Sequence, residues 1–175
     1  MSDAPNIVLI GMPAVGKSTV GVLLAKATSR AFIDTDVVLQ ARAGRRLQAI
    51  IEAEGLGGFR AMEERAVLAL DCRSHVIATG GSVVYSPRAM RHLKASGFVV
   101  HLHLPLPVLE RRLTDLGSRG VVMAPGESLR ELFAERQPLY ERWADTTIDC
   151  ADLGHEAVVA AILERLDAWL EQAPD

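Results

Sequence analysis

Lysine, cysteine and aromatic residues are scarce in this sequence. Of its 175 residues, three are lysine, two are cysteine and 5% are aromatic, whereas 16 are arginine. Cys72 and Cys150 are too far apart for a C-x-x-C pair or for the spacing of a metal site, and two cysteines make no disulfide framework. We therefore expect two reduced, structural thiols in a cytoplasmic protein.

Long apolar runs and a basic leader are also missing. No run approaches the ~20 apolar residues that a membrane-spanning helix needs, and residues 1–5 show no signal-peptide pattern. The formal net charge is −3, which gives no electrostatic case for a nucleic-acid or membrane partner. Because the length suits one hydrophobic core, we expect a cytoplasmic, single-domain monomer over residues 1–175.

Short apolar runs rich in β-branched residues alternate with longer helical patterns along the whole chain. This alternation is typical of βαβ units and predicts an α/β fold with a parallel sheet. The predicted strands are 6–10, 31–34, 75–79, 98–104 and 146–149. The predicted helices are 17–29, 35–54 (broken near Gly44), 57–71, 86–96, 106–115, 127–143 and 154–171.

A phosphate-binding loop follows the first predicted strand. Residues 11–19 read G-M-P-A-V-G-K-S-T and lead directly into a helix, which is the structural context that this motif requires. The backbone N–H groups and the positive end of the helix attract phosphate oxygens, Lys17 reaches the β- and γ-phosphates, and Ser18 binds Mg²⁺. A plain glycine turn does not explain the Lys-Ser-Thr that follows. The predicted ATP-binding residues of this loop are Gly11, Ala14, Val15, Gly16, Lys17, Ser18 and Thr19.

The next two strands also end in residues that suit a nucleotide site. Ligands of open parallel sheets bind beyond the carboxyl ends of the strands, so Asp34, Asp36 and the turn Gly80–Ser82 are expected to converge there. Asp34 is placed to hold Mg²⁺, through a water, and Asp36 to accept a hydrogen bond or the proton from an attacking hydroxyl. An N-cap role for Asp36 on the following helix is the alternative.

Three further features have an ordinary explanation when they are taken alone. Arg60 and Glu63 share a helix face and could form a surface pair, and Arg136 shows no connection to the site by itself. The glycine-rich segment 116–126 could be a plain connector between two helices. Its length and Arg119 favour a mobile lid over the nucleotide.

Together these segments resemble the shikimate kinase family, which belongs to the nucleoside-monophosphate-kinase-like group of phosphate-loop kinases. The resemblance covers almost the whole chain, with the motifs in the family's order. They are the loop at 11–19, D-x-D at 34–36, F-R-x-x-E at 59–63, the glycine turn at 80–82, a lid arginine at 119 and E-R-x-P-L-Y at 135–140.

The resemblance implies a three-layer α/β/α fold whose five-stranded parallel sheet has the order 2-3-1-4-5, with substrate-binding helices over about 35–63 and a helical lid. It implies that Arg60 and Arg136 clamp an acceptor carboxylate and that Glu63 holds Arg60 in place. Arg112 would lie against the adenine, and Arg119 would neutralise charge on the transferred phosphoryl group. The implied binding residues for the acceptor are Asp36, Arg60, Glu63, Gly80, Gly81, Ser82 and Arg136.

Two departures from the family pattern affect the acceptor. Ser82 replaces the third glycine of the turn and either narrows the space there or offers a new hydrogen bond. Gly120 replaces a proline after Arg119, which loosens the lid backbone. The predicted function is ATP- and Mg²⁺-dependent phosphorylation of a hydroxyl of shikimate in aromatic amino acid biosynthesis. The alternatives are a kinase of the same fold for a gluconate-type sugar acid and a non-catalytic nucleotide-binding module.

Overall fold

Five parallel strands form one sheet at the centre of the molecule. The computed structural model describes residues 4–116 and 121–172. The strand order is β2-β3-β1-β4-β5, as predicted. The strands are β1 (Asn6–Ile10), β2 (Ala31–Asp34), β3 (His75–Ala78), β4 (Gly97–His103) and β5 (Thr146–Asp149).

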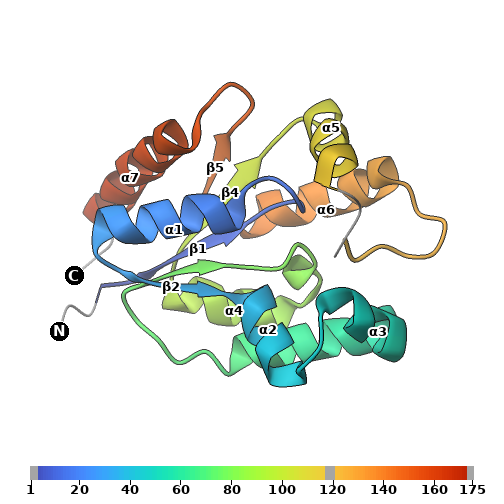
Figure 1. Cartoon of the computed structure of the whole chain (residues 1–175). Coiled ribbons are helices and arrows are strands. Elements are labelled where there is room, and N and C mark those ends of the chain that lie inside the picture. The colour runs from blue at the N-terminus through green and yellow to red at the C-terminus, as the bar shows by residue number, and fades with distance from the viewer. Residues whose placement is uncertain (1–3, 117–120, 173–175) are drawn as a thin grey trace.

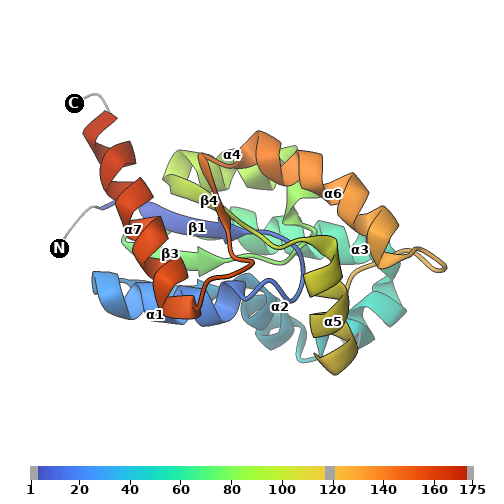
Figure 2. The same ribbon diagram turned by 90° about the horizontal axis from the view of Figure 1, so that it is seen from above.

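Helices cover both faces of this sheet (Figures 1 and 2). The helices α1 (Lys17–Thr28) and α7 (His155–Gln172) lie on one face, and α4 (Pro87–Ser96) and α6 (Leu129–Trp143) lie on the other. Three more helices gather toward the carboxyl ends of the strands (Figure 2). They are α2 (Thr35–Ala43), α3 (Leu47–Leu68) and α5 (Leu106–Leu116). A short 3₁₀ helix, η1 (Val83–Tyr85), follows β3.

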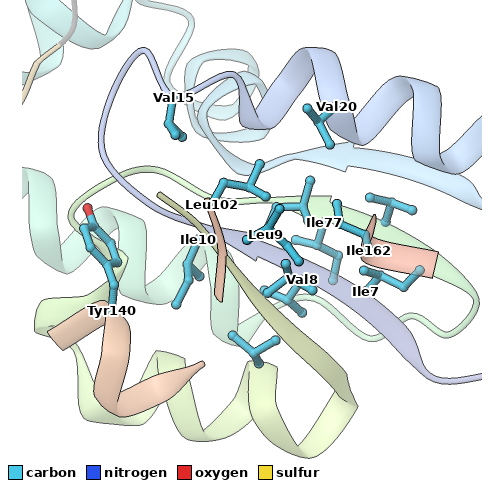
Figure 3. Close-up of a cluster of buried hydrophobic side chains, with 14 of the residues drawn as sticks. Ile7, Val8, Leu9, Ile10, Val15, Val20, Ile77, Leu102, Tyr140 and Ile162 are labelled. Atoms are coloured by element: carbon cyan, nitrogen blue, oxygen red, sulfur yellow. The ribbon is translucent and has the colours of Figure 1, made fainter. Parts of the chain in front are cut away.

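The core lies on both sides of β1 because this central strand is apolar throughout and pairs with β3 and β4. Ile7 to Ile10 are all fully buried, as expected for a strand covered on both faces. Val15 and Val20 pack against one side of the strand, whereas Tyr140 of α6 lies on the other (Figure 3). The phosphate loop therefore follows directly from the most buried strand, which holds the start of the loop in place.

The helix ends follow local sequence signals. The predicted break near Gly44 is confirmed, because Gly44 ends α2 in the left-handed conformation. The predicted gap between 54 and 57 corresponds to a kink at Gly55 within α3. Ser128 and Glu131 form a capping box that starts α6.

The described part of the predicted lid segment, residues 121–126, lies between two helices, as expected from its glycine-rich sequence. Helix α5 ends at Leu116, and residues 121–126 form an irregular segment and a turn. Pro125 and Gly126, the latter with φ of 81°, explain why a helix does not continue there. Val122 is buried in a second apolar cluster with residues of α2 and α3, namely Leu39, Ile50, Phe59 and Ala66.

None of the helices in the described part of the chain is long and apolar enough to cross a membrane.

Candidate active site

The phosphate loop curls tightly between β1 and α1. Gly11, Ala14 and Gly16 all have positive φ, at 147°, 64° and 106°. A Cβ atom on Gly11 would lie 2.5 Å from the Leu102 carbonyl oxygen of β4, so only glycine fits between the loop and the neighbouring strand. The loop can then present its backbone N–H groups to an anion at the start of α1.

Lys17 is buried in this loop and interacts with loop carbonyl oxygens. Its Nζ donates hydrogen bonds to the oxygens of Gly11 at 2.7 Å and Met12 at 2.8 Å. Burial lowers its pKa from 10.5 to about 8, with a further lowering by Arg136, while nearby carboxylates such as Asp36 act in the opposite direction. The ammonium is therefore charged at neutral pH and is held where phosphate oxygens would bind.

Asp34 connects the end of β2 to the phosphate loop. Its Oδ2 accepts a 2.6 Å hydrogen bond from the Ser18 hydroxyl. Its Oδ1 accepts from the backbone N–H groups of Asp36 at 3.0 Å and Val37 at 3.3 Å, which makes Asp34 the N-cap of α2. The capping role that was considered for Asp36 thus belongs to Asp34, and the Asp36 side chain is left for the crevice.

Asp36 lies in the first turn of α2 and lines the crevice beside Lys17. Burial and the neighbouring Asp34 raise its pKa from 3.8 to about 6, although Lys17 lowers it. A Cβ atom on Gly80 would lie 2.7 Å from Asp36 Oδ1 and would clash with Glu63 Oε1. Gly80 therefore allows both carboxylates to approach the end of β3, and Asp36 can accept a proton at neutral pH.

Glu63 is buried on α3 and binds Ser82 of the glycine turn. The Ser82 hydroxyl donates a 2.6 Å hydrogen bond to Glu63 Oε2, so the serine offers the new hydrogen bond that was one of the two expected consequences. Burial raises the pKa of Glu63 from 4.5 to about 7, against the effect of this hydrogen bond. Among the described residues no ion pair joins Glu63 to Arg60, which differs from the family-based expectation. The hydrogen bond with Ser82 holds the carboxylate instead.

Arg136 and Arg60 come from different helices and meet at Tyr85. Arg136 is fully buried on α6; its Nη2 donates to the Val122 carbonyl oxygen at 2.6 Å and its Nε to the Tyr85 hydroxyl at 3.3 Å. The Arg60 Cζ lies 3.9 Å from the centroid of the Tyr85 ring. A Cβ atom on Gly81 would lie 2.9 Å from Arg136 Nη1, so the glycine turn and this guanidinium are in close contact.

The side chains described above line two adjoining cavities. The larger has about 550 Å³ and the smaller about 10 Å³. The larger cavity is lined by Ala14, Gly16, Lys17, Ser18 and Thr19 of the loop and by Asp36, Arg112 and His155. The smaller is lined by Asp36, Glu63, Gly80, Gly81, Ser82, Val122 and Arg136. Most of the predicted nucleotide and acceptor residues are thus brought together, and Asp36 belongs to both cavities.

Three buried side-chain atoms in this region have no hydrogen-bond partner among the described residues. They are Glu63 Oε1, Arg136 Nη1 and Arg60 Nε. Glu63 and Arg136 also line the smaller cavity. Because buried polar groups are normally paired, these atoms mark places where a polar ligand would bind.

Arg112 and His155 lie next to the phosphate loop. Arg112 Nη1 donates to the carbonyl oxygens of Ala14 at 3.2 Å and Val15 at 3.3 Å. His155, the first residue of α7, has its Nε2 3.8 Å from the position of a Cβ atom on Gly16. Sequence reasoning missed both His155 and Tyr85, because neither lies in a recognised motif. Arg119 lies outside the described residues, so its lid role stays a prediction.

Comparison with known proteins agrees with this geometry. The model of the family described as shikimate kinase matches residues 13–167. The chain belongs to the shikimate kinase family. A shikimate kinase of Thiobacillus denitrificans is 37% identical over 95% of this chain and 93% of its own length. One from Mycobacterium avium is 39% identical over 94% of this chain and 95% of its own length.

Solved structures show the same family fold. A shikimate kinase from Acinetobacter baumannii in complex with shikimate has a TM-score of 0.87, with 31% identity over 94% of both chains. A gluconokinase from Sinorhizobium meliloti is 18% identical with a TM-score of 0.56, over 99% of this chain and 100% of that one, and shares the fold alone. Membership of the family confirms the predicted phosphotransferase with a hydroxyl acceptor and favours neither the gluconate-type alternative nor the non-catalytic one.

Proposed function

We propose that this chain transfers the γ-phosphoryl group of ATP to a hydroxyl of shikimate, with the acceptor bound in the smaller cavity. The observation that carries the proposal is the buried guanidinium of Arg136, whose Nη1 has no hydrogen-bond partner among the described residues. It lines the cavity that also contains Asp36 and Glu63, directly beside the phosphate loop. Shikimate carries one carboxylate and several hydroxyls, which match a cationic group flanked by two carboxylates.

The acceptor end works by positioning. Arg136 and Arg60 bind the acceptor carboxylate, since a guanidinium can donate two parallel hydrogen bonds to a carboxylate. Glu63 Oε1 accepts from a ring hydroxyl. Asp36 accepts a hydrogen bond from the reacting hydroxyl and then its proton, as that oxygen forms a bond to the γ-phosphorus and the bond to the ADP oxygen breaks. Its pKa of about 6 keeps Asp36 mostly ionised at pH 7.

The nucleotide end neutralises phosphate charge. The loop N–H groups and Lys17 bind the β- and γ-phosphates. Arg112, which is hydrogen-bonded to the loop, contacts the adenine base of ATP. Ser18 and Asp34 supply a hydroxyl and a carboxylate oxygen at the mouth of the crevice, and such oxygen donors suit Mg²⁺. When bound there, the cation would offset charge on the β- and γ-phosphate oxygens.

The smaller cavity is too small for shikimate as it stands, because about 10 Å³ is close to the space of one water molecule. Val122 lines this cavity, and its carbonyl binds Arg136. We infer that the lid segment around Val122 moves to admit the acceptor and that Arg119 closes with it onto the phosphoryl group. We further propose that the chain acts as a single-domain monomer in the cytoplasm.

The direct test is an activity assay in which ADP release is measured with shikimate and, separately, with gluconate. We expect turnover with shikimate, formation of shikimate phosphate by mass spectrometry, and no turnover with gluconate. Omission of Mg²⁺ should abolish the activity. ADP release without a phosphorylated acid, or preference for gluconate, would contradict the proposal.

A further inference from the structure

We propose that Tyr85 is a positioning residue that orients Arg60 and Arg136 for the acceptor carboxylate. This inference rests on the proposed function, because it concerns how the same arginines are held. The ring orients Arg60 and the hydroxyl orients Arg136. Neither the motifs of the sequence nor the family pattern pointed to this tyrosine.

Tyr85 contacts both guanidinium groups at once. The Cζ of Arg60 lies 3.9 Å from the ring centroid, and that of Arg136 lies 5.3 Å from it. The hydroxyl oxygen accepts the hydrogen bond from Arg136 Nε. One side chain thus links α3, which carries Arg60, to α6, which carries Arg136.

The position of Tyr85 is coupled to the turn that borders the acceptor cavity. Its backbone N–H donates to the Ser82 carbonyl at 3.1 Å, and the N–H of Val83 donates to the Gly80 carbonyl at 3.3 Å. Helix η1, which ends in Tyr85, contacts both α3 and α6. The ring is therefore fixed relative to the same turn that lines the site.

A neutral aromatic ring is suited to this task. Within the described residues no acidic side chain forms an ion pair with Arg60 or Arg136, so no directly paired carboxylate occupies the hydrogen-bond donors that an incoming carboxylate would use. An acidic partner would orient the guanidinium groups but would also compete with the acceptor. The ring face attracts a cation without neutralising it. Burial, with help from Glu135, raises the pKa of Tyr85, which keeps the hydroxyl neutral.

The first part of the test compares Tyr85→Phe with Tyr85→Leu in steady-state kinetics. Loss of a cation–π contact in a partly buried site corresponds to about a tenfold change, so Tyr85→Leu should raise the KM for shikimate by about that factor. Tyr85→Phe keeps the ring and loses the hydrogen bond, and should raise it by about threefold. The KM for ATP should stay unchanged in both variants.

The second part is a double-mutant cycle with Arg60→Ala. If Tyr85 acts through Arg60, Tyr85→Leu should raise the KM for shikimate much less in the Arg60→Ala background than in the wild type. A purely structural role for Tyr85 would leave the two effects additive and would also raise the KM for ATP. Additive effects, or an unchanged KM for shikimate in Tyr85→Leu, would overturn the inference.

Wild-type turnover with shikimate is measured first. If the wild type does not phosphorylate shikimate, the proposed function fails, and the role of Tyr85 toward that acceptor fails with it. If the wild type phosphorylates shikimate but the Tyr85 variants have the same KM for shikimate as the wild type, the proposed function stands and the inference about Tyr85 is overturned. Should Tyr85→Leu not fold, Tyr85→Phe decides the matter: an unchanged KM for shikimate in that variant rejects the positioning role.

Discussion

The Ser82 hydroxyl donates a 2.6 Å hydrogen bond to Glu63 Oε2 beside the smaller cavity that both residues line. Both side chains are buried, and the second oxygen of Glu63 has no hydrogen-bond partner among the described residues. Burial disfavours the charged carboxylate more strongly than the hydrogen bond favours it, so the pKa of Glu63 rises from 4.5 to about 7. The smaller cavity is therefore lined by a carboxylate that titrates close to neutral pH.

Glu63→Gln should stabilise the unliganded protein above pH 7. A carboxyl group whose pKa is raised on folding does not destabilise the folded state below its pKa in the unfolded chain, near 4.5. It destabilises the folded state most above its pKa in the folded protein, about 7. The amide has no charge to bury, so the free energy of unfolding of Glu63→Gln should exceed that of the wild type by about 3 kcal/mol at alkaline pH. Urea denaturation across this pH range measures the difference, which should vanish toward pH 4.5.

Two further variants control this experiment. Ser82→Ala removes the hydrogen bond that favours the charged carboxylate, so the pKa of Glu63 should rise further. The pH dependence of the free energy of unfolding should then extend to higher pH than in the wild type. Glu52→Gln, on the same helix but exposed, should show no comparable effect. A stabilisation by Glu63→Gln that is equal at all pH values would contradict the raised pKa.

The fold and most of the site could be predicted because their signals are local in the sequence. The phosphate loop, the strand that precedes it and the helix breaks at Gly44 and Gly55 are set by adjacent residues. The order of the strands and the acceptor residues came from the family resemblance. Tyr85 and His155 were missed because their roles depend on contacts with residues that are distant in the chain, which no short pattern encodes.

The pairing of Glu63 shows the limit of the resemblance. The family pattern predicted that Glu63 holds Arg60, whereas Glu63 binds Ser82 and Arg60 packs on Tyr85. Ser82 is one of the two departures that were recognised in the sequence, and the hydrogen bond was one of its two expected effects. Its partner could not be predicted, because the turn and α3 meet only in the folded protein.

Lys17 should give ATP binding an alkaline limit near pH 8. Its pKa falls to about 8 mainly through burial, so the free enzyme loses the positive charge as pH rises through that value. Since kcat/KM reports the free enzyme, kcat/KM for ATP should fall by about tenfold per pH unit above this limit. Bound phosphates favour the charged amine of Lys17. At saturating ATP, kcat should therefore begin to fall at a higher pH than kcat/KM does.

The control for Lys17 comes from the same helix. Lys26→Met, at an exposed position of α1, should leave the pH profile unchanged, whereas Lys17→Met should bind ATP weakly at every pH. Titration with a non-hydrolysable ATP analogue measures this directly. A wild-type affinity that is constant from pH 7 to well above pH 8 would show that the pKa is not lowered as inferred.

Arg136→Lys should weaken acceptor binding while ATP binding is retained. Lysine keeps the charge but lacks the planar group that binds a carboxylate and, at the same time, Val122 and Tyr85. Loss of such a buried, charged contact corresponds to about 2–3 kcal/mol, so the KM for shikimate should rise by roughly 30- to 100-fold. Arg130→Lys, exposed on the same helix, is the matched control. Equal increases in both KM values would argue against a carboxylate clamp.

His155→Ala should weaken the binding of ATP but not that of shikimate. The imidazole lines the larger cavity together with Arg112, and both groups lie close to Gly16 of the phosphate loop. Planar imidazole and guanidinium groups stack on a purine, so the KM for ATP should rise by about three- to tenfold when the ring is removed. Glu156→Ala, at the next exposed position, should have no such effect. Inorganic tripolyphosphate has no base, and its binding should be the same in His155→Ala and the wild type. A parallel loss of tripolyphosphate affinity would instead assign His155 to the phosphates.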